Sequence, residues 1–341
     1  MRAAELVAPL TFRLAEMPIE DPGPGDVQVR VEAVGVCGSD LHAYSEGAVG
    51  STPNVYPMVL GHEPAGKIVK TGPGVTALHP GDRGALEPAL YCYHCEFCLR
   101  GMYNVCANIR FLSSPHHPGF FRELVNLPAG NFIPLPVGIS MEEATLAEPL
   151  AVALHSLRLA CIRPCETVAV IGAGPIGLLT IAALRAAGAG RIWAVEPLAH
   201  RRRLAEMIGA HAGLEPAEAV QEILRGTGRL GVDCAMDCAA REGTTGQAIQ
   251  VTRSGGRVAL TGIHSTPFVP LDGSAMRRKE LTIFNVRRSN HESQAALGLL
   301  ETHTDWFAPL LTHTRKMDRI GEAFAIASQY QDGVGKMIVR P

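Results

Sequence analysis

The stretch Thr167–Glu196, TVAVIGAGPIGLLTIAALRAAGAGRIWAVE, guides the interpretation of the whole chain. It begins with the continuous apolar run Val168–Ile171, which is typical of a strand buried on both faces. A glycine array with G-x-G-x-x-G spacing follows directly, at Gly172, Gly174 and Gly177. An apolar helical segment (176–187) and a second short strand (191–195) then lead to Glu196. This order of strand, glycine array, helix, strand and acid predicts a dinucleotide-binding unit.

Each part of this unit has a physical role. The first glycine permits a tight turn, the second lets a pyrophosphate approach the backbone, and the third lets the helix pack closely on the strand. The helix N-terminus faces the phosphates, and the carboxylate of Glu196 can accept hydrogen bonds from ribose hydroxyls. The alternative is a glycine-rich loop in another kind of α/β unit, and the order of all five parts argues against it.

Composition narrows the class of protein. The chain has 341 residues, which predicts two domains, and 47% of them are hydrophobic, which excludes a disordered or fibrous protein. A formal net charge of −2 provides no basic field for nucleic acid, so we expect small molecules or further copies of the chain as partners. No apolar run approaches the ~18 residues of a membrane span, and no signal peptide is evident, so we expect a cytoplasmic protein without membrane contact.

Two patterns divide the chain. Roughly the first 90 residues carry short alternating runs, of which Val27–Val34 predicts a half-exposed antiparallel strand. Strands and helices alternate from 167 to about 286, which predicts a doubly wound parallel sheet. We expect strands at 231–238, 256–263, 281–286 and 336–340, and helices at 151–159, 201–208, 243–253 and 320–329. The predicted boundaries are a first domain at 1–147 with a cysteine lobe at 91–106, a dinucleotide-binding domain at 148–287, and a return to the first domain at 288–341.

Four of the nine cysteines form a regular cluster with C-x2-C-x2-C-x7-C spacing: Cys92, Cys95, Cys98 and Cys106. Short gaps let thiolates converge on one ion, and four thiolates complete a closed tetrahedral zinc site, whose role is structural. An iron–sulfur cluster is the sharpest rival, but its common bacterial spacing ends in x3-C-P, unlike the gap of seven here. Without a signal peptide, disulfides are the weaker interpretation.

A second group of metal-ligand residue types lies upstream. Cys37 and His42 frame the segment CGSDLH, and His62 with Glu63 lies in the segment GHEP. One thiolate, one imidazole and a carboxylate can make a zinc site that keeps a position open for water or substrate. Taken alone, an isolated cysteine is more often a buried apolar residue, and a single histidine is more often simply hydrogen-bonded.

The chain resembles the zinc-containing medium-chain dehydrogenase/reductase family, and within it the sorbitol (polyol) dehydrogenases. The resemblance covers essentially the whole chain. It rests on CGSDLH (37–42), GHEPAG (61–66), PGDR (80–83), the four cysteines, AEPLA (147–151) and GAGPIG (172–177). It implies a discontinuous GroES-like β-domain and a Rossmann domain, with the active site in the cleft between them and dimers or tetramers as the assembly. The chain departs from the pattern of the polyol dehydrogenases in two places. Many of them lack the four-cysteine lobe, and this chain has Arg287-Arg288 where sorbitol enzymes often have Arg-Tyr.

The resemblance also implies roles for residues. Cys37 and His62 match the catalytic zinc ligands, and Glu63 and Glu148 match acids that bind the zinc or approach it. Ser39 matches the hydroxyl beside the substrate oxygen, and His42 the outer histidine of a proton relay. Together with the structural site, this predicts two zinc ions per chain. Cofactor contacts are expected at Gly172, Gly174, Pro175, Ile176, Gly177, Glu196, Arg201, Thr261, Gly262, Ile263, Asn285, Val286 and Arg287. The substrate pocket is expected at Tyr44, Arg110, Phe111, Arg287 and Arg288.

The implied activity is oxidation of a secondary alcohol of a polyol or sugar derivative, with hydride transfer to NAD. Glu196 favours NAD because a carboxylate would repel a 2′-phosphate, although the arginines at 201–203 could serve NADP. The first alternative substrate is an anionic sugar, either a sugar phosphate or a sugar acid, because the guanidinium groups of Arg110, Arg287 and Arg288 could bind its anionic group. L-Threonine is the second, but the corresponding segment of threonine dehydrogenases usually reads DPFG.

Three other classes remain as alternatives. A zinc-free quinone reductase of the same family is the nearest of the three, and metal analysis would distinguish it. A non-catalytic zinc- and dinucleotide-binding protein would be expected to lose the open-site ligands, yet Cys37, His62, Glu63 and Glu148 are all present. A nucleic-acid-binding zinc protein is indicated only by the cysteine lobe, and the chain has no basic stripe.

Overall fold

The structure, a computed structural model, describes all residues from 1 to 341. The chain divides into two compact units. The first unit comprises residues 1–148, 290–304 and 311–341, and the second comprises 149–289 and 305–310.

The first unit is dominated by β-strands. Its strands are β1 (Arg2–Ala8), β2 (Thr11–Glu16), β3 (Asp26–Gly35), β4 (Ala48–Val49), β5 (Thr52–Pro53), β6 (Met58–Val59), β7 (Glu63–Thr71), β8 (Arg83–Leu86), β9 (Ala89–Leu90), β10 (Arg110–Phe111), β11 (Leu124–Pro128), β12 (Phe132–Pro134), β19 (Leu311–Lys316) and β20 (Lys336–Arg340). Its helices are α1 (Gly38–Glu46), α2 (Glu96–Leu99), α3 (Met141–Ala144), α10 (Ser293–Thr302) and α12 (Ile320–Ser328), with short 3₁₀ turns at η1 (Tyr103–Val105), η2 (Ala129–Asn131), η4 (Met317–Arg319) and η5 (Gln331–Gly333).

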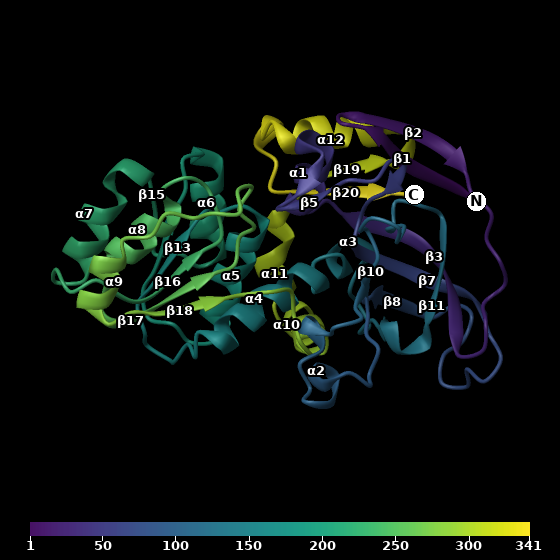
Figure 1. Cartoon of the computed structure of the whole chain (residues 1–341), viewed down its shortest axis with the longest axis horizontal. Helices are drawn as coiled ribbons and strands as arrows, with labels where there is room; N and C mark the ends of the chain where they lie inside the picture. Colours follow the sequence, from purple (N-terminus) through teal and green to yellow (C-terminus); the bar gives the residue numbers. More distant parts are fainter. The chain divides into compact units, whose positions relative to one another are not determined.

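Strand β3 is the centre of this unit. The main sheet has the order β12-β8-β7-β3-β20-β19, and β11 also pairs with β3. The C-terminal strand β20, yellow in Figure 1, therefore lies beside a strand from the beginning of the chain. The expectation that the segment 27–34 is half-exposed is wrong. Along β3 only Arg30 is exposed, because β7, β11 and β20 cover its edges and a core containing Phe121 and Phe324 packs in the same unit.

The second unit is a parallel sheet flanked by helices (Figure 1). Its strands are β13 (Val168–Ile171), β14 (Ile192–Val195), β15 (Ala212–Leu214), β16 (Val232–Asp237), β17 (Thr252–Leu260) and β18 (Thr282–Asn285). Its helices are α5 (Pro175–Ala186), α6 (Ala199–Ile208), α7 (Pro216–Gly226), α8 (Thr244–Val251) and α9 (Gly273–Lys279), with η3 (Ala308–Leu310). Two further helices, α4 (Ala147–Leu159) and α11 (Thr304–Phe307), each begin in the first unit and continue into the second.

The strand order β15-β14-β13-β16-β17-β18 is that of a Rossmann sheet, and all its strands are parallel. Strand order reverses between β13 and β16, the switch point at which such sheets bind their ligands. Every residue of β13 is buried, as its continuous apolar run predicts. Helix α8 ends at Val251, two residues before the predicted end, because Thr252 turns to extended backbone and begins β17.

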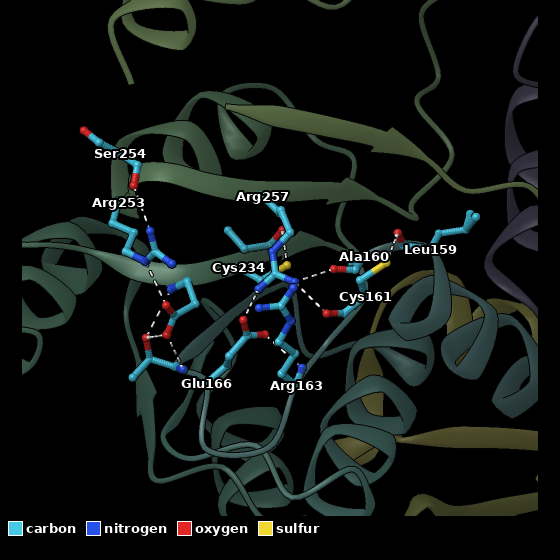
Figure 2. Close-up of polar contacts among 12 residues, drawn as sticks. Leu159, Ala160, Cys161, Arg163, Glu166, Cys234, Arg253, Ser254 and Arg257 are labelled. Atoms are coloured by element: carbon cyan, nitrogen blue, oxygen red, sulfur yellow. Dashed lines mark hydrogen bonds and ion pairs between the residues drawn. The ribbon is translucent and has the colours of Figure 1, made fainter. Parts of the chain in front are cut away.

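A polar cluster ties the beginnings of three strands together in the second unit (Figure 2). Arg257 on β17 donates to the carbonyls of Ala160 and Cys161, 2.7 Å each, and to Glu166. Beside it, Asp233 accepts hydrogen bonds from Thr167 and from Arg253. This cluster anchors the loop that precedes β13 at the edge of the sheet opposite the glycine array.

No helix of the structure combines the length and the apolar character that crossing a membrane requires.

Candidate metal centre and cofactor site

The four clustered cysteines converge within the first unit, and their sulfur atoms all lie within 4.8 Å of one another. Sγ of Cys92 lies 3.5 Å from Sγ of Cys106 and 4.0 Å from Sγ of Cys98, and the sulfurs of Cys95 and Cys106 are 3.9 Å apart. A tetrahedral zinc ion with bonds of about 2.3 Å places its four sulfurs about 3.8 Å apart. The lobe therefore fits a closed zinc site, with no fifth residue needed.

The polar surroundings of these thiols favour the thiolate in part of the set. Backbone N–H groups, His94 first, lower the pKa of Cys92 to about 5, and backbone N–H groups also lower the pKa of Cys95. Burial raises the pKa of Cys98 to about 12, so an ion must displace its proton on binding. The surroundings therefore favour the thiolate form of Cys92 and Cys95, the form that binds a metal, but not that of Cys98.

The second group of ligand-type side chains, the open site, consists of Cys37, His62 and Glu63. Cys37 lies between β3 and the first turn of α1, whereas His62 and Glu63 lie where β7 begins. One ligand atom from each residue falls within 4.8 Å of the other two. His62 and Glu63 are buried, with 6% and 1% of their surfaces exposed. A thiolate, an imidazole and a carboxylate in this arrangement fit a zinc ion that keeps one position free for another ligand.

Asp40 orients the imidazole of this site, a role that the sequence interpretation missed although the residue lies inside the CGSDLH segment. Its Oδ1 lies 3.3 Å from Nδ1 of His62, and its carboxylate also accepts hydrogen bonds from the backbone of Cys37 and Gly61. Burial alone would lower the pKa of His62, but Asp40 and Cys37 outweigh it and hold that pKa well above its usual value. A ligand histidine usually has its second ring nitrogen on a carboxylate, so the contact of Nδ1 with Asp40 favours Nε2 as the metal-binding atom.

Two further ionisable groups lie near the open site. Lys336, on β20, forms an ion pair with Glu63, and both side chains are 1% exposed. In the sequence, the only sign of this ion pair is a lysine within the otherwise apolar strand 336–340. Glu148 is outside the three-residue ligand group. Burial raises the pKa of Glu148 to about 8, and the nearby Glu63 contributes, while His62 opposes the shift.

The two residues expected to move a proton both lie on α1. Oγ of Ser39 lies 3.4 Å from Nε2 of His62, so its hydroxyl borders the open site. Three residues further along the same helix, His42 contacts Glu46, with 2.8 Å between Nδ1 and Oε1. Residues three apart share one face of a helix, so Ser39 and His42 lie along one side of α1.

The structure separates the expected substrate-pocket residues of the first unit. The ring of Phe111 lies 5.4 Å from the ring of His62, beside the open site. Arg110 precedes Phe111 on the same two-residue strand and is exposed. Tyr44 is buried in the core, its ring stacked on Phe12. The structure therefore places Phe111 beside the open site, and Arg110 and Tyr44 remain predictions for the pocket.

The glycine array has the shape that close approach of a dinucleotide requires. Gly174 caps α5 in an extended conformation, and Pro175 begins the helix. A side-chain carbon at Gly177 would overlap the carbonyl oxygen of Gly172, so only glycine lets α5 begin this close to β13. Ile176 lies in the first turn of α5, whose N–H groups are free to face phosphate oxygens.

Glu196 ends β14 next to this array. Its Oε2 accepts a hydrogen bond of 2.8 Å from the N–H of Ala173, and its Oε1 accepts one of 3.1 Å from Leu198. The carboxylate is thereby held beside the glycine array. Arg201 is buried at the start of α6, near Gly174.

The other expected cofactor residues follow the two strands beyond the switch point. Oγ1 of Thr261 lies 3.0 Å from Oγ of Ser156 on α4, which anchors the loop after β17. Gly262 and Ile263 continue that loop, and Asn285, Val286 and Arg287 end or follow β18, with Arg288 next in the chain. All belong to the second unit.

Comparison with known proteins agrees with both halves of this description. Residues 23–137 match the family model for the alcohol dehydrogenase GroES-like domain, and residues 175–302 match that for zinc-binding dehydrogenases. The fold and the ligand sets thus define a zinc-binding dehydrogenase built from a GroES-like unit and a Rossmann unit. The chain belongs to the zinc-containing medium-chain dehydrogenase/reductase family, and it is similar to sorbitol dehydrogenases.

Three relatives show the range of this likeness. Sorbitol dehydrogenase of Bacillus subtilis is 32% identical over 100% of this chain and 97% of its own length. L-Idonate 5-dehydrogenase of Vitis vinifera is 35% identical over 96% of this chain and 91% of its own length. A solved structure of a zinc-binding dehydrogenase homologue from Sinorhizobium meliloti 1021, bound to NADP, superposes with a TM-score of 0.91 at 30% identity, covering 100% of this chain and 99% of that one.

Proposed function

We propose that the protein oxidises a secondary alcohol of a polyol or sugar derivative, with hydride transfer to NAD. The observation that carries the proposal is the convergence of Cys37, His62 and Glu63 on one metal position, in a chain whose second unit presents a glycine array and Glu196. The relatives named sorbitol dehydrogenase and L-idonate 5-dehydrogenase support the substrate class.

The residues that would hold the catalytic zinc are Cys37, His62 and Glu63, with Glu148 as a further acid close by. When bound, zinc supplies a Lewis acid that lowers the pKa of an alcohol, and the nicotinamide supplies the hydride acceptor. The cysteine lobe would hold a second, structural zinc, so we propose two zinc ions per chain.

Side chains of the protein orient the zinc ligand His62 and carry the substrate proton. Asp40 contacts the ring of His62, and the hydroxyl of Ser39 can accept the proton of the substrate oxygen while it passes its own proton onward. His42, paired with Glu46 further along α1, is the group we assign to its release toward solvent. The ring of Phe111 provides an apolar wall beside His62, which excludes water from the reacting carbon.

Glu196 supports NAD as the physiological cofactor. Its carboxylate is fixed beside the glycine array, where an NAD ribose hydroxyl can donate to it and a 2′-phosphate would be repelled. A relative has been solved with NADP bound, so both cofactors must be assayed.

An anionic sugar substrate is the second candidate, favoured by Arg287 and Arg288 after β18 and by the likeness to L-idonate 5-dehydrogenase. Arg110, the third arginine of this hypothesis, is exposed on β10.

The test is a panel of neutral polyols, sugar acids, sugar phosphates and L-threonine, assayed by NADH or NADPH formation together with metal analysis. We expect turnover of neutral polyols with NAD, two zinc ions per chain, and loss of activity in Cys37→Ser. Zinc in the lobe alone, or full activity of Cys37→Ser, would contradict the proposal. Preference for sugar acids that Arg288→Ala abolishes would favour the second candidate.

A further inference from the structure

Lys336 is the most deeply buried cationic side chain of the first unit, and its location is not explained by packing. It begins β20 in an otherwise apolar stretch, with 1% of its side chain exposed. Its ammonium forms an ion pair with Oε2 of Glu63, which is buried to the same extent. Burying an ammonium and a carboxylate is costly even when they are paired, and an apolar pair of similar size is often as stable or more stable. A role other than stability is therefore required to account for this pair.

The pair forms across an intervening strand. Glu63 lies on β7 and Lys336 on β20, and β3 runs between them. Neighbouring strands are about 4.8 Å apart, so the backbones of β7 and β20 are separated by about twice that distance. On β3, Gly35 stands directly opposite Glu63 and also pairs with Ile338 of β20. The two side chains meet over Gly35.

Only glycine permits this meeting. A side-chain carbon on Gly35 would overlap Oε2 of Glu63 and lie 2.8 Å from Cε of Lys336. Its φ is not in the left-handed region, so the backbone itself does not require glycine. Glycine is therefore required at position 35 because the side chains of Glu63 and Lys336 occupy the space that a Cβ would fill. Gly35, Glu63 and Lys336 form one arrangement.

The arrangement leaves one oxygen of Glu63 for another partner. Both oxygens of Glu63 are buried and neither accepts a hydrogen bond of ordinary geometry, but Oε2 is in ion-pair contact with Nζ of Lys336, whereas Oε1 has no such contact. A carboxylate oxygen of Glu63 lies within 4.8 Å of the ligand atoms of Cys37 and His62. A buried carboxylate oxygen normally has a partner, so this oxygen, which lies beside a thiol and an imidazole, is suited to bind a metal ion.

We propose that Lys336 is a positioning residue of the open metal site, which acts through Glu63. It holds Oε2, so that Oε1 is directed at the ion, and its positive charge offsets the charge of Glu63 where Cys37 contributes a second anion. Gly35 supplies the space in which the pair forms. The inference rests on the proposed zinc site, and it deepens that proposal by assigning residues outside the ligand set.

The test measures zinc affinity at the open site by chelator competition, with zinc retained in the cysteine lobe, and the visible spectrum after cobalt replaces zinc at the open site. Lys336→Met removes the ammonium at similar length. Lys70→Met is the matched control, because its ion pair with Asp21 is at the surface. We expect Lys336→Met to weaken zinc binding 10–100-fold and to change the cobalt spectrum, as loss of groups that orient metal ligands does. Lys70→Met should leave both unchanged.

A double-mutant comparison separates positioning from general stability. If Lys336 acts through Glu63, adding Lys336→Met to Glu63→Gln should cause no further loss of affinity. Wild-type affinity and spectrum in Lys336→Met, or an undiminished effect in the Glu63→Gln background, would overturn the inference. Should Lys336→Met fail to fold, Lys336→Gln retains a donor for Oε2 without the charge, and an affinity equal to wild type in that variant would refute the role of the charge. A wild-type protein that binds zinc only in the lobe would instead refute the proposed function.

Discussion

Oδ1 of Asp40 lies 3.3 Å from Nδ1 of His62, and the same carboxylate accepts hydrogen bonds from the N–H groups of Cys37 and Gly61. One buried acid thus orients a histidine and also fixes the backbone on both sides of the open site. Burial alone would raise the pKa of Asp40, but His62 and the two backbone donors hold it below its usual value. Asp40 therefore remains a carboxylate in ion-pair contact with the Nδ1 side of the ring, on which Nδ1 has no other partner.

Replacing Asp40 by asparagine should weaken zinc binding at the open site 10–100-fold, because the ring of His62 loses the charged acceptor that sets its orientation and tautomer. Chelator competition measures this, with the lobe zinc as an internal reference. Asp21→Asn is the control, since that side chain is 80% exposed. An affinity of Asp40→Asn equal to that of the control would show that His62 is oriented by other contacts.

The parts of the site that could be predicted from sequence are those whose geometry is local. The glycine array and the four cysteines each occupy a short segment, in which spacing alone determines what converges. Lys336 could not be found in this way. Its contact with Glu63 depends on the strand order β7-β3-β20 and on the missing side chain of Gly35, and no local pattern encodes either.

The expectation for β3 was wrong for a related reason, because burial depends on contacts between distant segments. Tyr44 is likewise buried against Phe12, whereas Arg110 on β10 is exposed. Strand β3 was expected to be half-exposed because its residues alternate, but three partner strands cover it, and pairing is not visible in periodicity.

Loss of one lobe cysteine should remove one zinc ion without abolishing the other site. Cys95→Ser breaks the set of sulfurs spaced 3.5–4.0 Å apart, and three thiolates with a hydroxyl bind zinc far less tightly. We expect metal analysis to fall from two ions to one and the thermal unfolding temperature to decrease, because a closed zinc site contributes directly to folding. Cys161→Ser, an exposed cysteine outside the lobe, should retain both ions. Two ions in Cys95→Ser would contradict the assignment of the lobe.

Glu196→Ala should reduce the preference for NAD over NADP. The carboxylate is held by the N–H groups of Ala173 and Leu198, so it is available at a fixed position for a ribose hydroxyl. A hydrogen bond to a charged acceptor contributes about 1.5–3 kcal/mol, which corresponds to roughly 10–150-fold in KM for NAD. Steady-state kinetics with both cofactors measure the ratio of kcat/KM. We expect NADP values to stay the same or improve, since the repulsion of a 2′-phosphate is removed. An unchanged ratio would show that selectivity resides elsewhere, with Arg201 the next residue to replace.

The second unit should lose stability in acid through Asp233. Burial alone would raise the pKa of this group, but the N–H and hydroxyl of Thr167 and the guanidinium of Arg253 outweigh it and lower the pKa. A lowered folded-state pKa stabilises the fold at pH values above the unfolded-state pKa, about 3.9, and the contribution disappears as pH falls through the folded-state value. Asp233→Asn should therefore be less stable than wild type by about 1–2 kcal/mol at neutral pH, a figure reduced for partial exposure.

The difference in stability between the two proteins should shrink steadily below about pH 4. Urea midpoints of both proteins, measured from pH 7 to pH 3, provide the comparison, and zinc loss in acid affects both equally. A difference that stays constant across this range would mean that Asp233 stabilises the unit by packing, since only the ionised group loses its contribution on protonation.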